Sequence, residues 1–479
     1  MPARPALDPA TARAVAAADQ GFDEIIAGLE QLVQIPSCSF PGFDPRHVEQ
    51  SAAATSAWLR GAGFPSVEIL RLPGVLPYVL ATDHRAGPKA PTVVLYAHHD
   101  VQPPLRESAW RTPPFTPTRQ GGRLYGRGAA DDKGGIAVHV ASAQAWNRTL
   151  GHPPVNLTVV IEGEEEIGSH HFPEFLRRYR ERLRGDCLII ADLQNFDTGL
   201  PSLTTSLRGL VVIECQTQAL RAPVHSGIWG GAVPDATLAL CRMLSSLTDA
   251  AGRLTVPGLQ SQVREPTTLE LEAFARLPYV RARVAEQAGM QESALPLDGA
   301  TLYKRMWREP ALSINVIQAG TRGQTGNVVM DGAWARIGIR IVPDMDPQAT
   351  YDLVTAHLQV QLPAGVTLTT TPLSLGSPWA TTPDHPIFSL ARDALHHGYG
   401  QEAVFMGCGA SIPFVQEMSA TLGDIPALLL GVEDPECGAH SENESVHLGD
   451  LRSTIRAQTA FFGLLAAHPQ LGRAKESGA

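Results

Sequence analysis

The chain has 479 residues, more than one ordinary hydrophobic core holds, which favours two or three domains. Its formal net charge of -10 argues against nucleic acid or an anionic membrane surface as a partner. The six cysteines are scattered without a CxxC pair, which is typical of a reducing compartment. We expect a cytoplasmic protein, because the N-terminus lacks a signal-peptide core and no apolar run reaches the ~18 residues of a membrane span.

The first two hundred residues alternate between short apolar runs and amphipathic segments. The apolar runs predict strands that are buried on both faces, at 92–97, 157–161, 187–191 and, much later, 427–432. The amphipathic segments predict helices at 134–147 and 172–183. This β/α alternation indicates an α/β domain with a largely parallel sheet that is covered by helices.

The pattern changes after about Thr204. The runs 210–218 and 335–344 alternate strictly between apolar and polar residues, so each predicts a strand with one buried face. In the second run we expect Ile337, Ile339 and Ile341 to point inward and the arginines between them outward. With predicted helices at 235–248 and 349–360, this region indicates a smaller α+β domain.

The order of these segments predicts one domain inserted into another. We expect residues 1–203 and 378–479 to form the first domain and residues 204–377 to form the inserted one. The stretch 250–310 is interrupted by prolines and predicts no definite element.

Each predicted buried strand is followed by histidine or acidic residues. They are His98 and Asp100, then Glu162, Glu164, Glu165 and Glu166, then Asp192, and finally His440. Ligands of doubly wound sheets lie beyond the carboxyl ends of the strands. Carboxylates this crowded repel each other, so at least one should be protonated unless nearby cations neutralise the charge. Taken alone, His98 is better explained as a structural turn residue, but the convergence of four such strand ends predicts a metal site.

Two further acids follow a glycine-rich turn in the run "LYGRGAADDKGG". Asp131 and Asp132 could simply cap the helix predicted at 134–147. Alternatively, one of them could bridge two metal ions. A glutamate that is not occupied by metal could then act as the general base for hydrolysis.

Six motifs together resemble one family of enzymes. In chain order they are "YAHHDVQP", "LYGRGAADDKGG", "EGEEEIGS", "VHSGIWGGAVPDA", "IRIVPDM" and "GAHSENE". They are similar to the carnosinase and cytosolic non-specific dipeptidase branch of the dinuclear zinc metallopeptidases, a family that includes glutamate carboxypeptidase and aminoacylase. The resemblance covers about residues 20 to 465. It implies a zinc-peptidase-like catalytic domain and an inserted lid domain through which two subunits dimerise.

The resemblance also implies a set of metal ligands. It implies that His98 and Asp192 bind one ion and that Glu166 and His440 bind the other. Asp131 would bridge the two ions. The two divalent ions of each subunit would be zinc, with manganese or cobalt as alternatives. The family further implies a cis peptide bond between Asp131 and Asp132.

Other residues of the motifs would act around the metals. By resemblance, Asp100 orients His98, and Glu165 is the general base. Glu162 and Glu164 fall outside the ligand positions, so we expect them to be solvated or to support the ligands from behind.

The inserted domain carries residues that resemble substrate-binding positions. His225 would reach the active site of a partner subunit and stabilise an oxyanion, and Arg340 would bind the carboxylate end of the substrate. Asn327 and Ser411 resemble residues that line the substrate pocket. Read alone, His225 could be a turn residue and Arg340 a solvated strand charge. The dipeptidase branch often has Arg-Glu before the serine loop, whereas this chain has Met406-Gly407-Cys408.

These observations predict hydrolysis of the peptide bond in dipeptides or similar small peptides. An amidohydrolase that deacylates N-acyl amino acids is the alternative, since it would use the same metals. A catalytically inactive metal-binding scaffold is a third hypothesis. A nucleotide-binding module is not supported, because the chain has no GxxxxGK[ST] motif. We expect a homodimer with a small peptide or acyl-amino-acid substrate.

Overall fold

The computed structural model describes residues 6–323 and 326–471. The chain forms two compact units, each made of segments that are separated in the sequence. Unit 1 comprises Met1–Thr205, Thr381–Met406 and Glu417–Ala479, and unit 2 comprises Ser206–Ala380 and Gly407–Gln416. No helix in the described ranges combines the length and apolar character needed to cross a bilayer.

Unit 1 is built on a mixed sheet with a parallel centre. The central strands run in the spatial order β6 (Asn156–Glu162), β3 (Thr92–His98), β7 (Cys187–Gln194) and β17 (Ala427–Glu433). Each of these neighbouring pairs is parallel. The flanking strands pair in antiparallel fashion and are β1 (Ser66–Leu70), β2 (Tyr78–Asp83) and β8 (Ser202–Leu207). The expected α/β class with a mainly parallel central sheet is confirmed.

The four predicted buried strands are all present. Their apolar side chains are buried because helices cover both faces of the sheet, which explains the continuous apolar runs in the sequence. One detail of the prediction was wrong. Asp192 lies within β7 rather than after it, because this strand continues to Gln194.

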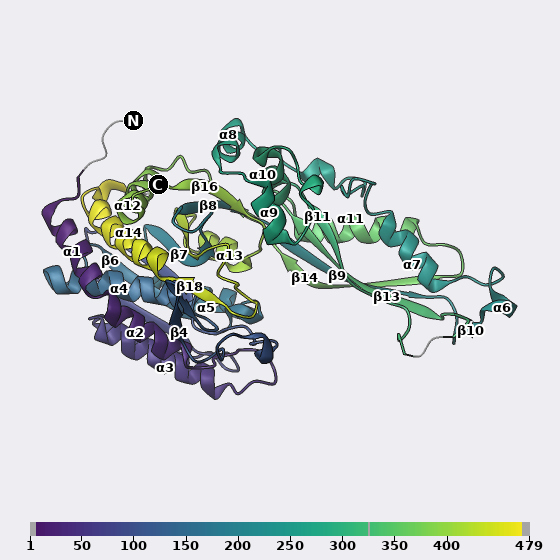
Figure 1. Cartoon of the computed structure of the whole chain (residues 1–479), viewed down its shortest axis with the longest axis horizontal. Coiled ribbons are helices and arrows are strands. Elements are labelled where there is room, and N and C mark those ends of the chain that lie inside the picture. The colour runs from purple at the N-terminus through teal and green to yellow at the C-terminus, as the bar shows by residue number, and fades with distance from the viewer. Residues whose placement is uncertain (1–5, 324–325, 472–479) are drawn as a thin grey trace. The chain divides into compact units, whose positions relative to one another are not determined.

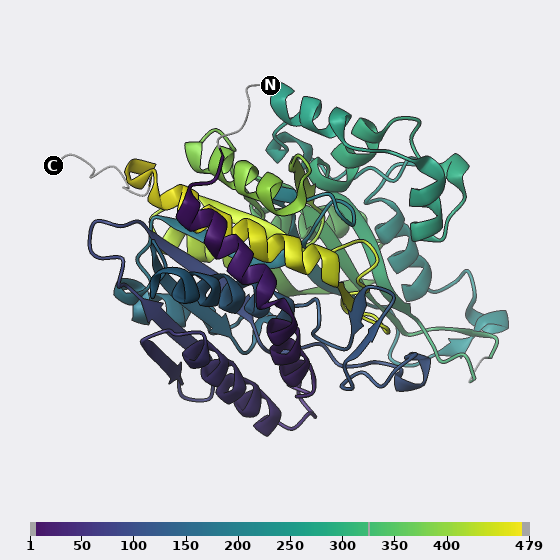
Figure 2. The same ribbon diagram turned by 60° about the vertical axis from the view of Figure 1, so that its left-hand side comes forward.

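Helices of unit 1 pack on this sheet and on one another. They are α1 (Pro9–Gln20), α2 (Phe22–Val33), α3 (Arg46–Gly61), α4 (Lys133–Leu150), α5 (Phe172–Tyr179), α12 (Pro386–Tyr399) and α14 (Leu448–Ala466). α1 and α14 lie side by side although they come from opposite ends of the chain (Figures 1 and 2). The predicted helix 172–183 was too long, since α5 ends at Tyr179 and a short 3-10 turn follows.

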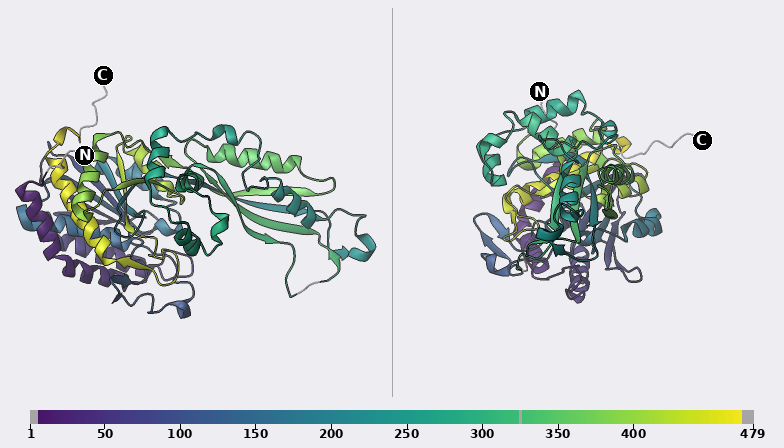
Figure 3. Two further views of the ribbon diagram at one scale, coloured as in Figure 1. Left: turned by 45° about the horizontal axis from the view of Figure 1, so that its top comes forward. Right: turned by 90° about the vertical axis from the view of Figure 1, so that its right-hand side faces the viewer.

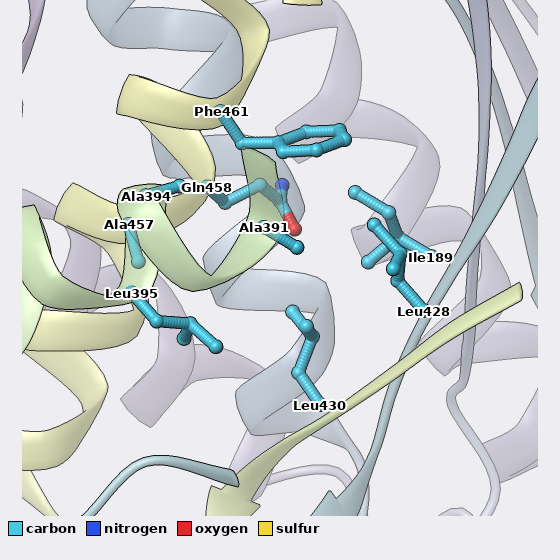
Figure 4. Close-up of a pocket in the computed structure, with 9 residues that line it drawn as sticks. All are labelled: Ile189, Ala391, Ala394, Leu395, Leu428, Leu430, Ala457, Gln458 and Phe461. Carbon is cyan, nitrogen blue, oxygen red and sulfur yellow. The ribbon is translucent and has the colours of Figure 1, made fainter. Parts of the chain in front are cut away.

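A small cavity lies in the apolar core between α12, α14 and the sheet (Figure 4). Leu428 and Leu430 of β17 and Phe461 of α14 line it, and Gln458 is its single polar residue. The amide oxygen of Gln458 lies 3.1 Å from Nδ1 of His139. With no acidic group in its wall, this cavity is part of the core.

A second, small sheet of unit 1 joins distant segments of the chain. It consists of β4 (Thr118–Gln120), β5 (Arg123–Tyr125) and β18 (Ser445–His447). β18 pairs with β5 in antiparallel fashion. This pairing brings the "GAHSENE" motif beside the "LYGRGAADDKGG" turn.

Unit 2 contains a four-stranded antiparallel sheet (Figure 3). Its strands, in spatial order, are β11 (Ala311–Gln318), β13 (Gly332–Ile341), β9 (Gly209–Gln218) and β14 (Thr367–Gly376). The helices α7 (Ala236–Ser245) and α11 (Pro347–Val360) pack against it. Ile337, Ile339 and Ile341 are fully buried, which confirms the predicted alternation.

Unit 2 also contains elements that the sequence did not predict. The stretch 250–310 forms three helices, α8 (Thr268–Arg276), α9 (Arg281–Ala288) and α10 (Gly299–Arg308). A separate two-stranded antiparallel sheet pairs β10 (Val224–His225) with β12 (Val328–Val329), and the short helix α6 (Ser226–Trp229) follows β10. α13 (Pro413–Thr421) begins in unit 2 and ends in unit 1. The chain also passes between the units within β8, within β16 (Val404–Cys408) and directly after β15 (Trp379–Ala380).

Candidate dinuclear metal centre

The carboxyl ends of the central strands deliver the acidic and histidine side chains to one edge of the sheet. His98 ends β3 and pairs in register with Glu162, which ends β6. Asp192 lies near the end of β7, and Glu433 ends β17. The parallel arrangement therefore gathers side chains from four separate segments.

Asp131 lies between two histidines. Its Oδ1 is 3.0 Å from Nε2 of His98, and its Oδ2 is 3.0 Å from Nε2 of His440. Asp192 approaches the first histidine, with 3.5 Å between its Oδ1 and Nε2 of His98. Glu166 approaches the second, with 3.4 Å between its Oε2 and Nε2 of His440. All five predicted ligand positions thus lie together in unit 1.

The donor set suits two divalent cations. Ligand atoms of His98, Asp131 and Glu166 lie within 4.8 Å of one another, and so do those of Asp131, Asp192 and Glu433. Imidazole nitrogens mixed with carboxylate oxygens are the donors that zinc, manganese and cobalt accept. Burial, together with the neighbouring carboxylates, raises the pKa of Glu166 well above its usual value. Bound cations would offset the repulsion between these carboxylates.

The Asp131 loop is held in place by Glu444 of the "GAHSENE" motif. The buried carboxylate of Glu444 accepts hydrogen bonds from Nη1 of Arg127 at 2.6 Å and from the backbone N–H of Gly128 at 3.0 Å. It also accepts from the backbone N–H groups of Ala130 at 3.0 Å and Asp131 at 3.1 Å. A single acid therefore fixes the backbone from which Asp131 projects.

Asp132 binds backbone N–H groups, in contrast to Asp131. Its carboxylate accepts from the backbone N–H of Gly135 at 3.1 Å, which caps α4, and from that of His98 at 3.2 Å. The helix-cap alternative is therefore right for Asp132, while Asp131 projects between the histidines. The expected cis peptide bond joins the two aspartates.

Asp100 supports the site through the backbone as well as through its carboxylate. Nδ1 of His98 lies 3.0 Å from the main-chain oxygen of Asp100 and 3.4 Å from its Oδ1. The carboxylate also accepts from the backbone N–H groups of Glu165 at 3.2 Å and Glu166 at 3.1 Å. Burial raises the pKa of Asp100, but His98 and the hydrogen bond from Ser39 together outweigh this, so the pKa is lowered overall. Asp100 therefore fixes both the histidine and the glutamate turn.

Glu165 is the least constrained acid of the site. Its Oε2 lies 3.9 Å from Nε2 of His98, and its side chain is 18% exposed. Within the described ranges, no hydrogen bond reaches its carboxylate. Burial raises the pKa of Glu165 well above its usual value, and nearby carboxylates such as Asp192 add to this. A raised pKa suits a group that accepts a proton at neutral pH.

Glu162 and Glu164 are buried, so the expectation that they could be solvated was wrong. The Tyr96 hydroxyl donates to Oε2 of Glu162 at 2.7 Å, and the Tyr78 hydroxyl donates to Oε1 of Glu164 at 3.1 Å. The backbone N–H of His171 donates to the same oxygen of Glu164 at 3.0 Å. Burial raises the pKa of Glu162 to about 8. Both carboxylates are therefore held by tyrosine hydroxyl groups inside unit 1.

Glu433 is a site residue that the sequence analysis missed. It is half-buried, and its carboxylate lies within 4.8 Å of ligand oxygens of Asp131 and Asp192. Burial raises its pKa well above the usual value, and the charges of Asp131 and Asp192 add to the rise. It directly follows the predicted strand 427–432, so the same strand-end rule could have found it.

The predicted residues of unit 2 form two separate groups. His225 is exposed, and its Nδ1 accepts from the backbone N–H of Gly227 at 3.0 Å. The residue after His225 donates its backbone N–H to the main-chain oxygen of Asn327 at 2.8 Å, so these two residues lie together at the small sheet of β10 and β12. Elsewhere in this unit, Nη1 of Arg340 donates to Oγ of Ser411 at 2.8 Å.

The chain matches a known peptidase family over most of its length. Residues 94–463 correspond to the peptidase family M20/M25/M40. The chain belongs to this family. It is 30% identical over 465 residues to the Cys-Gly metallodipeptidase dug1 of Schizosaccharomyces pombe, an alignment that covers 94% of this chain and 97% of that protein.

One further sequence comparison and one structural comparison support the assignment to this family. It is 28% identical over 461 residues to the Beta-Ala-His dipeptidase of Homo sapiens, covering 92% of this chain and 90% of that protein. The solved structure of the di-peptidase Dug1p from Saccharomyces cerevisiae is similar, with a TM-score of 0.82 and 26% identity over 95% of this chain and 98% of that chain. The family resemblance inferred from the six motifs is confirmed.

The raised pKa of Glu162 predicts a pH-dependent stability of the metal-free peptidase. A carboxyl group binds its proton more tightly in the folded state when its pKa rises from ~4.3 to the folded value. Its stabilising contribution is therefore complete below ~4.3 and is lost as the pH rises towards about 8. In Glu162→Gln the amide imitates the protonated acid and still accepts from Tyr96.

We expect the free energy of unfolding of chelator-treated protein, measured with urea between pH 5 and 8, to fall less steeply with rising pH in Glu162→Gln than in the wild type. The slopes of the two proteins should differ by at most about 1.4 kcal/mol per pH unit. Glu174→Gln, at an exposed position of α5, serves as the control and should follow the wild type. Equal slopes in all three proteins would contradict the assignment.

Proposed function

We propose that this peptidase is a metal-dependent dipeptidase that hydrolyses the peptide bond of dipeptides or similar small peptides. The observation that carries the proposal is the carboxylate of Asp131, which reaches one histidine with each oxygen. The carboxylate of Glu165 lies beside this arrangement, 3.9 Å from Nε2 of His98, and accepts no hydrogen bond from the described residues. The relatives from Schizosaccharomyces pombe and Homo sapiens, which are named as dipeptidases, support the same activity.

The proposed ligands divide between two ions. His98 and Asp192 would hold one ion, Glu166 and His440 would hold the other, and Asp131 would bridge them. Zinc is our first choice, with manganese or cobalt as alternatives. When bound, two divalent ions lower the pKa of a water molecule and polarise the substrate carbonyl.

The protein side chains supply the proton transfers. The carboxylate of Glu165 accepts a proton from the attacking water, whose oxygen adds to the peptide carbonyl carbon. Glu165 then gives this proton to the leaving nitrogen as the C–N bond breaks. Asp100 holds the backbone N–H of Glu165 and thereby keeps the base in place.

We assign substrate recognition to unit 2. Arg340 would bind the terminal carboxylate with its planar guanidinium, supported by Ser411. Asn327 would contact the substrate, and His225 would stabilise the oxyanion from the partner subunit of a homodimer. Residues 204–377 would then form the lid and dimerisation domain, with residues 1–203 and 378–479 as the catalytic domain.

Two alternatives receive less support. Deacylation of N-acyl amino acids would use the same metal centre, but the yeast and human relatives are named as dipeptidases. A panel of dipeptides against acetyl- and succinyl-amino acids separates the two reactions. An inactive scaffold would not need Glu165 beside a full set of ligand positions. The cytoplasmic location stays a prediction.

Replacing the proposed base tests the mechanism. We expect Glu165→Ala to lower kcat by about a hundred- to ten-thousandfold, because no other group would take the proton from water. Its content of divalent metal should stay that of the wild type. Glu174→Ala, at the exposed position in α5, should retain full activity. Near-normal turnover in Glu165→Ala would eliminate this residue as the base.

The proposed role of His225 can be tested with mixed subunits. His225→Ala and Glu165→Ala should each be nearly inactive as homodimers. If His225 acts across the dimer, a hybrid contains one site with both residues intact, so mixing should restore part of the activity. Activity that fails to return after verified subunit exchange would contradict action across subunits.

A further inference from the structure

Two arginines of unit 2 lie close together beside the loop that contains Ser411. Arg340 is in β13, where it pairs with Leu210 of β9. Arg208 comes two residues before Leu210, so an extended chain places its side chain on the same face as Arg340. Diagonal neighbours of this kind are roughly 7–8 Å apart, within reach of long side chains.

The serine loop fixes one side of each guanidinium. Nε of Arg208 donates to the main-chain oxygen of Gly409 at 3.1 Å, and Nη1 of Arg340 donates to Ser411 at 2.8 Å. A Cβ atom at position 409 would lie only 2.9 Å from Nη2 of Arg208, so glycine permits this close approach. Each arginine has five N–H donors, so most of them remain available for a ligand.

No acid among the described residues forms an ion pair with either arginine. Within residues 6–323 and 326–471, no carboxylate oxygen lies within 4.0 Å of a guanidinium nitrogen of Arg208 or Arg340. Arg336 provides a contrast on the same strand and the same face, because its Nη2 lies 2.8 Å from Oε1 of Glu214. Arg340 faces Leu210 where Arg336 faces Glu214.

The positive charges persist although they are unfavourable. Burial, together with the charge of Arg340, lowers the pKa of Arg208 to about 10. Burial also lowers the pKa of Arg340. Both groups remain protonated at neutral pH, so two half-buried positive charges lie side by side. An anionic ligand would relieve this repulsion.

Position 408, just before the serine loop, carries a thiol rather than a carboxylate. The backbone N–H of Arg208 donates to the main-chain oxygen of Cys408 at 3.2 Å, and a charge on the Cys408 thiol would raise the pKa of both arginines. No acidic residue stands at positions 406–408 to offset the charges of the arginines.

We propose that Arg208 and Arg340 together bind the two carboxylates of a C-terminal aspartate or glutamate. The inference rests on the proposed function, in which Arg340 binds the terminal carboxylate. Arg208 then takes the side-chain carboxylate, which is separated from the first by only a few carbon atoms. The enzyme therefore prefers dipeptides that end in an acidic residue.

Two isosteric dipeptides test this preference. We expect kcat/KM for Ala-Glu to exceed that for Ala-Gln by about tenfold or more in the wild type, mainly through a lower KM. The reason is that only the glutamate side chain forms a hydrogen bond between charged groups with Arg208. In Arg208→Met the ratio should fall to about one, since only the charged substrate loses a partner. Cys408→Glu should also lower the ratio, because it adds a carboxylate beside both arginines.

Arg336→Met is the matched control on the same strand face, and it should keep the wild-type ratio. A wild-type ratio near one with ready hydrolysis of Ala-Gln would overturn the inference and leave the dipeptidase proposal intact. An unchanged ratio in folded Arg208→Met, or in Cys408→Glu, would also overturn it. Hydrolysis of neither dipeptide by metal-loaded wild type would overturn the proposed function itself.

Discussion

The repulsion among buried carboxylates at one edge of the central sheet is the constraint on which the site depends. Asp131, Glu165, Glu166, Asp192 and Glu433 converge there, and burial raises the pKa of several of them. Two histidines offset only part of this negative charge. A pair of divalent cations would resolve this repulsion, and the same cations would supply the Lewis acid for hydrolysis.

The arrangement is held by acids that bind backbone rather than metal. Glu444 fixes the Asp131 loop, Asp132 holds the backbone of His98, and Asp100 holds the turn of Glu165 and Glu166. Each anchor connects segments that are far apart in the sequence. The geometry of the site is therefore built into the fold of unit 1, because moving one loop would break several charged hydrogen bonds at once.

Much of unit 1 and of its site could be predicted because both follow local rules. Apolar runs marked the buried strands, and acids at the strand ends marked the sheet edge. The burial of Glu162 could not be predicted, because it depends on Tyr96 and on packing between strands. The helices of 250–310 were missed because prolines interrupt the helical periodicity of the apolar residues in this stretch. The roles of Asp131 and Asp132 could not be separated by pattern, since both follow the same glycine-rich turn.

The most direct test of the account is the number of divalent ions that each chain binds. We expect elemental analysis of dialysed wild type to give two ions per chain. Asp131→Ala should lose tight binding of both, because this side chain would bridge them. A wild-type protein that binds no divalent ion under these conditions, while remaining folded and active on dipeptides, would contradict the account.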